Sequence, residues 1–600
     1  MVQISRASLV KGAAVGLMAT TSATSSLGYN CSPGQACWPS NKEWERLNDT
    51  LSGNLYRTVP YAATCYYSSP HYDPEPCAVV AEDYKENQPR TEVYGAASGL
   101  NWESCLSNTC ALNPSNTSQV LSNDCYLGRL SSLYVDARDA SHVATVIKFA
   151  QEHNLRVSIK NTGHDYFGRS TSPNTLAIWT HNMNTMKYHK DFTASNCPAA
   201  NGKNIGEMGA GTQAVDAYTY FQTFNMDVTG GNEGSVGLAG GFGQGGGHGV
   251  FGPSYGLMVD NAVEFDVVTA DGKFRTINQC NDPDLFWAMR GGGGGSFAVL
   301  INYRFQLHEA VKINVYSFLA EFKPSSNKTT TNYPVLQEVL TKHATYQPVW
   351  SHNNVSGHAY YWPGEVALYF VLPSNNVTAL KDLTSEFDSF VSNHPEIVGQ
   401  SNYTTYDTYT DYLGLTSAIA SKLSPGGMFE ILASRLVPES LFGTNESVTD
   451  LVDAVVKGIQ IGEGIMPGLT SLIQIIMTTP VNHQNGAETS VNPAWRSALW
   501  HTIMTGGWSE NLPPSNATAR VEGWLGTIEP LKDITPGGGC YVNEGHYLEP
   551  EWQETFFGTN YVGLLEAKKK YDPTHFFDCW KCVGWEGLSD DYYCYDDKTY

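Results

Sequence analysis

The sequence predicts an α+β fold with more than one domain, and three observations support this. Residues 133–160 contain a short strand, an amphipathic helix and an alternating strand, in that order. A stretch of twenty residues at 230–249 holds eleven glycines and precedes another strand pattern. Beyond residue 307 glycines become fewer, and alternating and helical segments indicate a second α+β domain. A chain of 600 residues is also too long for one small core.

The first domain is predicted element by element. Within 140–153, Val143, Val146, Ile147 and Ala150 recur at i, i+3, i+4 and i+7, which is typical of an amphipathic helix. Residues 155–160 alternate as a strand and lead into the polar loop NTGHDYFG at 161–168. The later elements are strands at 205–211, 263–268 and 299–307 and helices at 214–224 and 284–289.

The glycine stretch, GGNEGSVGLAGGFGQGGGHG, predicts backbone N–H groups wrapped around an anion such as a phosphate or pyrophosphate. The alternative is a flexible linker, but core-type residues such as Val236, Leu238 and Phe242 interrupt the glycines. A G-x-G-x-x-G pattern spans 241–246. Because Gly247, Gly249, Gly252 and Pro253 deny it the following helix, a nicotinamide site of the doubly wound kind is not expected.

Composition and the first residues bear on location and partners. The net charge is −23 and no basic stripe is present, so nucleic acid is not an expected partner. Residues 1–23 are interpreted as a signal peptide, and the alternative is a disordered start. No apolar run is long enough for a membrane span. Secretion and glycosylation also fit eight Asn-x-Ser/Thr sites, at Asn48, Asn116, Asn327, Asn354, Asn376, Asn402, Asn445 and Asn516.

The thirteen cysteines cluster toward the two ends of the chain, which in an exported protein indicates disulfides. An odd count leaves a thiol unpaired, and Cys197 and Cys280, which lie apart from the clusters, are the candidates. The pair Cys579 and Cys582 has the C-x-x-C spacing of a redox site. Its place in the tail, with no βαβ context, favours a structural disulfide.

The second domain contains alternating segments at 311–322 and 359–370 and helical segments at 380–391 and 448–461. If residues 359–370 form one strand, Tyr361 and Tyr369 share a face and Tyr360 points away.

The quoted motifs carry a resemblance to a known family. Residues 134–168 and 230–272 resemble the two halves of the flavin-binding domain of the vanillyl-alcohol-oxidase superfamily. Residues 37–55 and 541–577 resemble its berberine-bridge-enzyme-like branch, especially secreted fungal members such as isoamyl alcohol oxidases. The resemblance implies a two-subdomain FAD-binding domain of PCMH type at 127–309 and a substrate domain with an antiparallel sheet at 310–535. A disulfide-rich arm at 24–126 precedes them, and the tail at 536–600 returns to the FAD domain.

The resemblance implies FAD, linked covalently through His164 to the 8α-methyl of the flavin. Many relatives add a cysteinyl bond, but Glu233 stands where that cysteine would be, so a single covalent link is expected. Glu233 is either a polar contact to flavin or substrate or a solvated loop residue. The other expected cofactor contacts are Asn161, Thr162, Gly163, Asp165, Gly168, Gly231, Asn232, Glu233, Ser235, Gly237, Gly240, Gly241, Gly245, Gly246, Gly247, Asn261 and Val263. No metal site is expected.

The implied function is hydride transfer from an alcohol to FAD, with O2 as the reoxidant, and it needs a base near the flavin. The expected catalytic residues are Tyr541, Asn543 and Tyr361, although Tyr541 fits equally well as a core residue. Weaker candidates are Arg435, His501 and His546. The alternatives are a tailoring oxidase that forms C=C bonds or rings in a secondary metabolite, and a ligand-binding glycoprotein with a degenerate flavin site.

Overall fold

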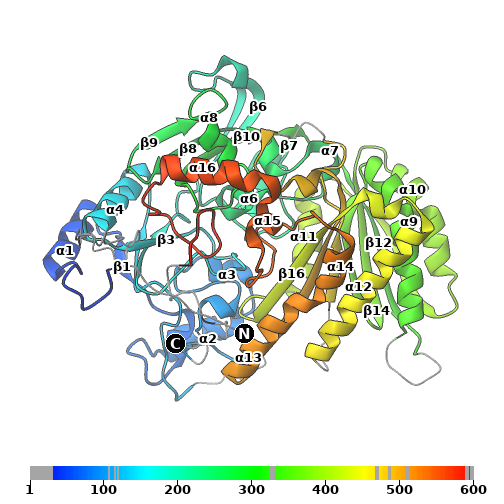
Figure 1. The fold of residues 1–600 in the computed structure, drawn as a ribbon, viewed down its shortest axis with the longest axis horizontal. Helices are drawn as coiled ribbons and strands as arrows, with labels where there is room; N and C mark the ends of the chain where they lie inside the picture. The colour runs from blue at the N-terminus through cyan, green and yellow to red at the C-terminus, as the bar shows by residue number, and fades with distance from the viewer. Residues whose placement is uncertain are drawn as a thin grey trace, which may run out of the picture.

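The structure is a computed structural model, and it describes residues 31–105, 108–113, 116–117, 121–324, 332–423, 425–466, 472–483, 488–508, 512–587 and 594. The expected signal peptide at 1–23 lies outside this part of the chain. Figure 1 shows the first half of the molecule, residues 127–309, and the tail beside the second half, residues 310–535, which is built on one large sheet.

The first half contains two main sheets, and the sequence patterns predict two strands of the first sheet and three of the second. The four-stranded sheet has the order β1-β2-β4-β3, with β2–β4 and β3–β4 parallel. Helix α4 (Ala140–Glu152) is capped by Asp139, whose side chain accepts hydrogen bonds from the backbone N–H of Ser141 and His142. The helix buries the predicted apolar stripe. The bounds are β1 Leu55–Arg57, β2 Leu133–Asp136, β3 Arg156–Lys160 and β4 Thr175–Trp179.

The second sheet of this half is five-stranded and antiparallel, with the order β5-β6-β10-β8-β9. The predicted strands at 205–211, 263–268 and 299–307 are its three central members. The bounds are β5 Met186–Phe192, β6 Gly202–Gly209, β8 Ala262–Thr269, β9 Phe274–Ile277 and β10 Ala298–Gln306, with helices α5 Ala214–Gln222, α6 Gly243–Gly245, α7 Gly252–Tyr255 and α8 Pro283–Ala288. A small ribbon of β7 Met226–Asp227 and β11 His308–Glu309 lies beside it.

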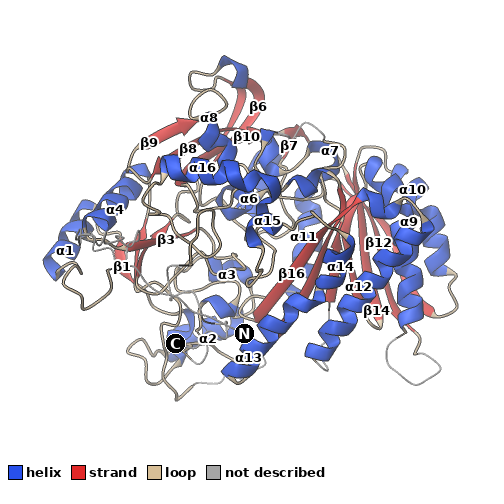
Figure 2. Cartoon of the chain, in the orientation of Figure 1, coloured by secondary structure: helices blue, strands red, loops and turns tan. Residues whose placement is uncertain are grey.

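The second half is a seven-stranded antiparallel sheet, β15-β12-β14-β13-β17-β18-β16. Figure 2 shows helices packed along one face of this sheet. Its opposite face therefore remains for the site. The strands are β12 Ile313–Phe322, β13 Ser356–Trp362, β14 Glu365–Pro373, β15 Ile397–Tyr406, β16 Phe429–Pro438, β17 Leu472–Ile476 and β18 Ala498–Trp508. The helices are α9 Tyr333–His352, α10 Ala379–Ser392, α11 Tyr409–Leu423, α12 Asn445–Ile465, α13 Pro514–Trp524 and α14 Glu529–Ile534.

One expectation about this sheet is wrong. Residues 359–370 do not form a single strand, because β13 and β14 are the two arms of an antiparallel hairpin that pairs Trp362 with Glu365. The turn inverts the face assignment. Tyr361 is fully buried on the helix side, where its hydroxyl hydrogen-bonds His343 Nδ1 at 2.7 Å. Tyr360 and Tyr369 lie together on the other face, with ring centroids 6.3 Å apart.

The N-terminal arm and the tail close over the first half. The arm contains α1 Asn41–Thr50, α2 Pro74–Asp83 and α3 Asn87–Thr91, and it adds β1 to the edge of the four-stranded sheet. The tail contains α15 Trp552–Phe557 and α16 Tyr561–Tyr571 and lies across the first half (Figure 1). A disulfide between Cys105 and Cys594 joins the two segments.

All thirteen cysteines are placed. Cys197 and Cys280, expected as candidates for the free thiol, instead form a disulfide, and the buried Cys540 is the free cysteine. The two residues of that disulfide are 83 positions apart, so the separation gave no sign of the pairing. Cys579 and Cys582 form the expected disulfide. The other pairs are Cys31–Cys37, Cys65–Cys77 and Cys110–Cys125.

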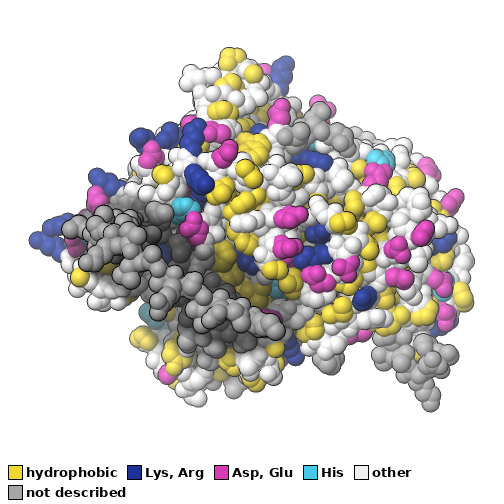
Figure 3. All heavy atoms as spheres, in the orientation of Figure 1, with side chains coloured by type: hydrophobic (Ala, Val, Ile, Leu, Met, Phe, Trp, Pro, Cys, Tyr) yellow, Lys and Arg dark blue, Asp and Glu magenta, His cyan; other side chains and the backbone are white. Residues whose placement is uncertain are grey.

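Acidic and basic side chains are interspersed over the face shown in Figure 3, with apolar groups between them. Among the described residues, no helix combines the length and the apolar character that crossing a membrane requires.

Candidate functional site

A cavity of about 330 Å³ lies between the first half and the free face of the seven-stranded sheet, which is the face opposite the packed helices. This size is within the range of small-molecule and cofactor sites. Both predicted loops line it, although about seventy residues separate them in the chain. The predicted cofactor contacts that line the cavity are Asn161, Thr162, Gly163, His164, Asp165, Gly231, Asn232, Glu233, Gly237, Gly240 and Gly241.

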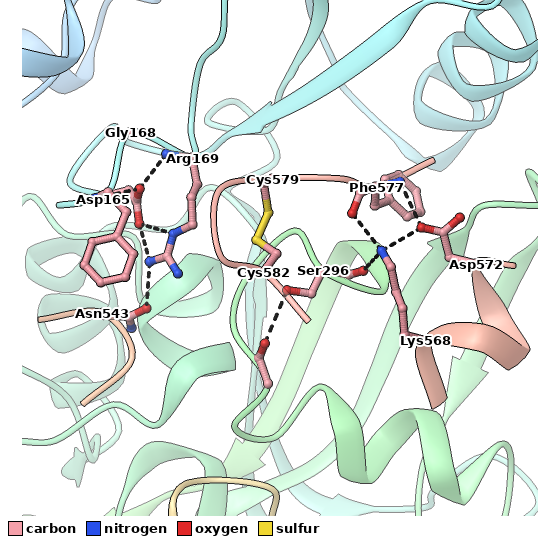
Figure 4. The surroundings of a disulfide bond; sticks show 12 residues. Asp165, Gly168, Arg169, Ser296, Asn543, Lys568, Asp572, Phe577, Cys579 and Cys582 are labelled. Carbon is pink, nitrogen blue, oxygen red and sulfur yellow. Dashed lines mark hydrogen bonds and ion pairs between the residues drawn. A yellow bond between two sulfur atoms is a disulfide. The ribbon is translucent and has the colours of Figure 1, made fainter. Parts of the chain in front are cut away.

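The loop that carries His164 is held by the residue that follows it. Asp165 accepts hydrogen bonds from the backbone N–H of Phe167 and Arg169 and forms an ion pair with the Arg169 guanidinium. Arg169 in turn reaches Asn543 Oδ1 at 3.4 Å. Figure 4 shows this group beside the Cys579–Cys582 disulfide, whose Cys579 also lines the cavity. The tail therefore braces the loop.

His164 faces the second loop. Its Nε2 lies 2.8 Å from Ser235 Oγ, and Ser235 Oγ donates to Glu233 Oε1 at 2.7 Å. Burial lowers the pKa of His164, with a smaller contribution from the Lys160 charge, while Glu233 opposes the shift. Glu233 is therefore a half-buried side chain held by Ser235, which is easier to reconcile with a polar contact in the site than with a solvated loop residue.

Two glycines of the second loop allow the loops to meet. A Cβ on Gly237 would lie 1.8 Å from Asn161 Oδ1, and one on Gly240 would lie 2.9 Å from Asn161 Cγ. A side chain at either position would therefore force the loops apart. Asn161 Nδ2 donates to Thr180 Oγ1 and to the carbonyl of Ala210, while its buried Oδ1 has no hydrogen-bond partner in the structure.

Seven expected cofactor contacts do not line the cavity. Ser235 acts on it through His164, whereas the other six have structural contacts. A Cβ on Gly168 would meet the Trp102 ring at 2.5 Å, and one on Gly245 would meet Asn543 at 2.6 Å. Asn261 is occupied by the carbonyls of Tyr255 and Leu257 and by His308. The remaining three are Gly246 beside Tyr541, Gly247 between Met258 and Phe242, and Val263 in a small core with Cys197.

Tyr541 and Asn543 line the cavity but are committed to the second loop. Tyr541 Oη accepts from Gly247 N at 3.2 Å and from Asn543 Nδ2 at 2.8 Å, and it donates to the Phe242 carbonyl at 3.4 Å. Asn543 Nδ2 also donates to the Gly241 carbonyl at 3.0 Å. Burial, followed by the Glu544 charge, raises the pKa of Tyr541. The structure thus favours positioning roles for both residues over proton abstraction.

The opposite wall of the cavity comes from the free face of the seven-stranded sheet and from α11. It is mostly apolar and aromatic, with a few polar groups. Its members include His358, Tyr360, Tyr369, Tyr412, Glu430, Leu432, Gln474, Ile476, Ile503 and Thr505. Burial, and then the neighbouring Tyr369, raises the pKa of Tyr360. Both tyrosine hydroxyls are therefore donors at neutral pH.

A buried cluster of one carboxylate and two imidazoles lies where the two walls meet. Glu544 Oε2 lies 3.3 Å from His248 Nε2 and 3.5 Å from His501 Nδ1. His248 Nδ1 lies 2.8 Å from Thr478 Oγ1. Glu544 and His248 line the cavity, whereas His501 is fully buried behind them. The donor atoms of the three residues lie within 4.8 Å of one another, so the cluster has a spacing that could also hold a metal ion.

The electrostatics of this cluster favour an ionised carboxylate. Burial alone would raise the pKa of Glu544, but its interactions with the neighbouring imidazoles, first of all the hydrogen bond and charge of His248, outweigh it and lower the pKa. Burial lowers the pKa of His501 to about 3, so His501 is neutral. Burial and the proximity of His248 also lower the pKa of His358 to about 4.

Sequence reasoning missed most of this cluster. His501 was only a weak candidate base, and Glu544 and His248 were not chosen although each adjoins a chosen motif. Two of the other candidates lie elsewhere, because Arg435 is buried against Thr535 and His546 is buried with its Nε2 2.9 Å from the Val521 carbonyl. Tyr361 is also absent from the cavity lining. Glu544 directly follows Asn543, an expected catalytic residue, and a carboxylate at that position is a candidate base in its own right.

Comparison with known proteins accounts for this arrangement. Residues 131–278 match the model of the FAD binding domain, and residues 540–581 match the model described as berberine and berberine like. The VAO-type flavoprotein oxidase VAO615 of Thermothelomyces thermophilus is 32% identical over 94% of this chain and 94% of its own. The chain belongs to the berberine-bridge-enzyme-like branch of the vanillyl-alcohol-oxidase superfamily. It is an FAD-dependent oxidoreductase.

Two further relatives agree. The FAD-linked oxidoreductase ZEB1 of Gibberella zeae is 31% identical over 95% of both chains. The crystal structure of the VAO-type flavoprotein MtVAO615 from Myceliophthora thermophila C1 superposes with a TM-score of 0.79 at 29% identity and covers 92% of this chain and 97% of that one. The α+β two-domain fold expected from the sequence is thereby confirmed.

The residues present fit an FAD. Gly237 and Gly240 leave room for the backbone to approach a ligand, and the position of a Cβ on Gly241, which lines the cavity, has no atom within 4 Å. The unpartnered Asn161 Oδ1 supplies a polar contact beside them. His164 presents an imidazole to the same space.

Proposed function

We propose that this protein is a secreted oxidase that removes a hydride from the carbon of an alcohol, with FAD linked through His164 and O2 as the electron acceptor. FAD supplies the hydride acceptor at N5 and passes the electrons on. The single observation that supports an alcohol substrate is the half-buried Glu544 carboxylate, which lines the cavity and whose lowered pKa keeps it ionised at neutral pH. The six disulfides fit an oxidising compartment.

Glu544 is the proton acceptor of this proposal. Alcohol oxidation requires the hydroxyl proton to leave as the hydride leaves the carbon, and a positioned base contributes about 10²–10⁴-fold to such a step. His248 hydrogen-bonds the carboxylate and holds it in place, and the neutral His501 packs behind it with Nδ1 3.5 Å away. Tyr541 and Asn543 hold the glycine loop against which the ring system would lie.

Tyr360 and Tyr369 orient the substrate. Their hydroxyls stay protonated at neutral pH and donate to the alcohol oxygen, while the apolar residues Leu432, Ile476 and Ile503 exclude water. The mostly apolar and aromatic lining of the sheet side of the cavity fits a partly apolar alcohol better than a simple sugar.

A substrate screen with two readouts tests this function. The purified protein is incubated with primary and secondary alcohols, sugars and polyketide-like compounds, and H2O2 release is measured in air. Flavin bleaching at 450 nm is then followed without oxygen. We expect an alcohol to give both signals. Bleaching without H2O2 would indicate a dehydrogenase, and a product with a new C=C bond or ring would instead indicate a tailoring oxidase.

The covalent link has its own test. The wild-type protein is expected to stay yellow after denaturation in acid, whereas His164→Ala is expected to release its flavin completely. Covalent flavin retained in His164→Ala would refute the assignment. A colourless wild-type protein with intact fold would refute the flavoenzyme function altogether.

A further inference from the structure

The second loop places a carboxylate and a hydroxyl in line behind His164. Ser235 Oγ lies 2.8 Å from His164 Nε2 and 2.7 Å from Glu233 Oε1, and the backbone N–H of Ser235 also donates to Glu233 Oε1 at 3.2 Å. The backbone contact closes a short turn that fixes the carboxylate under the hydroxyl. The three side chains form an unbroken chain of hydrogen bonds, which we name the His164 relay.

The chemistry of the three groups sets the direction of these bonds. An ionised carboxylate only accepts, so the single hydroxyl proton of Ser235 points to Glu233. Ser235 Oγ must then accept from His164, which places the imidazole proton on Nε2. The hydrogen-bond pattern therefore assigns the tautomer in which Nδ1 carries the free electron pair.

We propose that the His164 relay activates the linking histidine: Glu233, acting through Ser235, prepares His164 Nδ1 to form the covalent bond to the flavin. This rests on the proposed single link through His164. The structure places a carboxylate where many relatives carry a second linking cysteine, and the inference gives that replacement a role. It makes Glu233 a positioning residue for attachment and not a contact that is needed for turnover.

The step balances as follows. Nδ1 forms a bond to the 8α carbon of FAD, and that carbon loses one hydrogen as a proton to solvent. The Nε2 proton passes to Ser235 Oγ as the Ser235 proton passes to Glu233. The electron pair of the broken C–H bond remains on the ring system, so the attached flavin is reduced by two electrons. O2 then takes these electrons and two protons and leaves as H2O2.

Burial is consistent with this role. His164 and Glu233 line the cavity and are half-buried, whereas Ser235 between them is 2% exposed, so the middle of the relay is shielded from bulk water. Burial lowers the pKa of His164, which keeps the imidazole neutral and nucleophilic at neutral pH. The loop bearing His164 is rigid because Asp165 and Arg169 tie it to the tail (Figure 4).

The test separates attachment from binding. Full-length apoprotein is produced in a riboflavin-starved host and mixed with FAD in air. Attachment is followed by flavin fluorescence of the denatured chain on a gel and by the intact mass, while total binding is followed by quenching of free FAD. The variants are Glu233→Gln, Ser235→Ala and the conservative Glu233→Asp. Glu309→Gln, an exposed carboxylate on β11, is the matched control.

We expect Glu233→Gln and Ser235→Ala to bind FAD and to attach it about 10²-fold more slowly or worse, as for loss of a general base. Glu233→Asp should recover part of the rate, and the control should match the wild type. Raising the pH should partly restore attachment in Glu233→Gln, because hydroxide can then take the Nε2 proton.

Two results would overturn the inference. One is attachment at the wild-type rate in both relay variants. The other is loss of FAD binding in proportion to attachment, which would make the contacts merely structural. Failure of the proposed function looks different, because covalent flavin would then persist in His164→Ala or be absent from the wild type.

Discussion

The two walls of the cavity are built in different ways. The cofactor wall consists of two loops in which backbone and glycine dominate, and Gly237 and Gly240 pack directly against Asn161. The substrate wall consists of side chains from β13, β14, β16, β17, β18 and the tail, and its polar groups are tyrosines, histidines and carboxylates. The comparison indicates that the first wall is specified by local sequence, while the second exists only after long-range strand pairing.

The first prediction is aimed at the cofactor wall and has the largest expected effect. Gly237→Ala would place a Cβ 1.8 Å from Asn161 Oδ1, so the protein should be recovered without flavin and with unfolding free energy reduced by about 1–3 kcal/mol. Flavin absorbance and thermal unfolding measure both effects. The control is Gly414→Ala on α11, where a Cβ meets no atom within 4 Å and helix propensity should stabilise slightly. Full flavin content in Gly237→Ala would show that the two loops do not meet tightly.

The second prediction is aimed at the substrate wall. Glu544→Gln keeps the shape of the side chain but removes its charge, so kcat should fall about 10²–10⁴-fold while flavin content stays unchanged. Steady-state kinetics with the substrate found in the screen measure this. Glu551→Gln, an exposed position in the same tail segment, is the control. Unchanged kcat in Glu544→Gln would assign the base elsewhere.

The third prediction separates two neighbouring residues on opposite faces of β13. Tyr360→Phe should lower kcat/KM by about tenfold, because it removes one hydrogen bond to the substrate. The unfolding free energy should change little. Tyr361→Phe should leave kinetics unchanged and cost about 1–2 kcal/mol in unfolding free energy, because it leaves His343 Nδ1 unpaired in the core. The reverse result would mean that Tyr361, and not Tyr360, contacts the substrate.

The fourth prediction concerns pH and has the smallest expected effect above pH 5. The proposed base is active when ionised, and its pKa is lowered from the ordinary value of 4.5. Activity that depends on Glu544 is therefore present at neutral pH and is lost only as the pH falls below 4.5. A pH profile of kcat/KM should stay flat from neutral to that point. An acid limb centred near pH 6 or 7 would favour a histidine as the base.

The difference between the walls also explains how far the sequence could be interpreted. Periodicity located α4, β3 and β8 correctly, since each is specified by its own residues. The loops around His164 and Gly237 were recognised because glycine and loop motifs are contiguous. The face of Tyr361 was assigned wrongly because a turn of two residues, Pro363 and Gly364, was overlooked in an alternating run.

The base cluster and the free thiol were out of reach for a related reason. Glu544 and His248 are 296 positions apart, and nothing local to either residue indicates the other. The pairing of Cys197 with Cys280 depends likewise on where β5 and β9 end, on opposite edges of one sheet. Such contacts require the fold before the residues can be paired.

The bridge between Cys105 and Cys594 spans 489 positions and turns most of the polypeptide into a covalent ring. Such a ring cannot close until synthesis has passed Cys594, so the bridged form can exist only after both segments have met an oxidising environment. Residues of both bridged segments, among them Ser98 and Asn543, border the cavity. A reducing agent that opens this bond would thus release the N-terminal arm and the tail from each other. Two borders of the active centre would loosen in a single event.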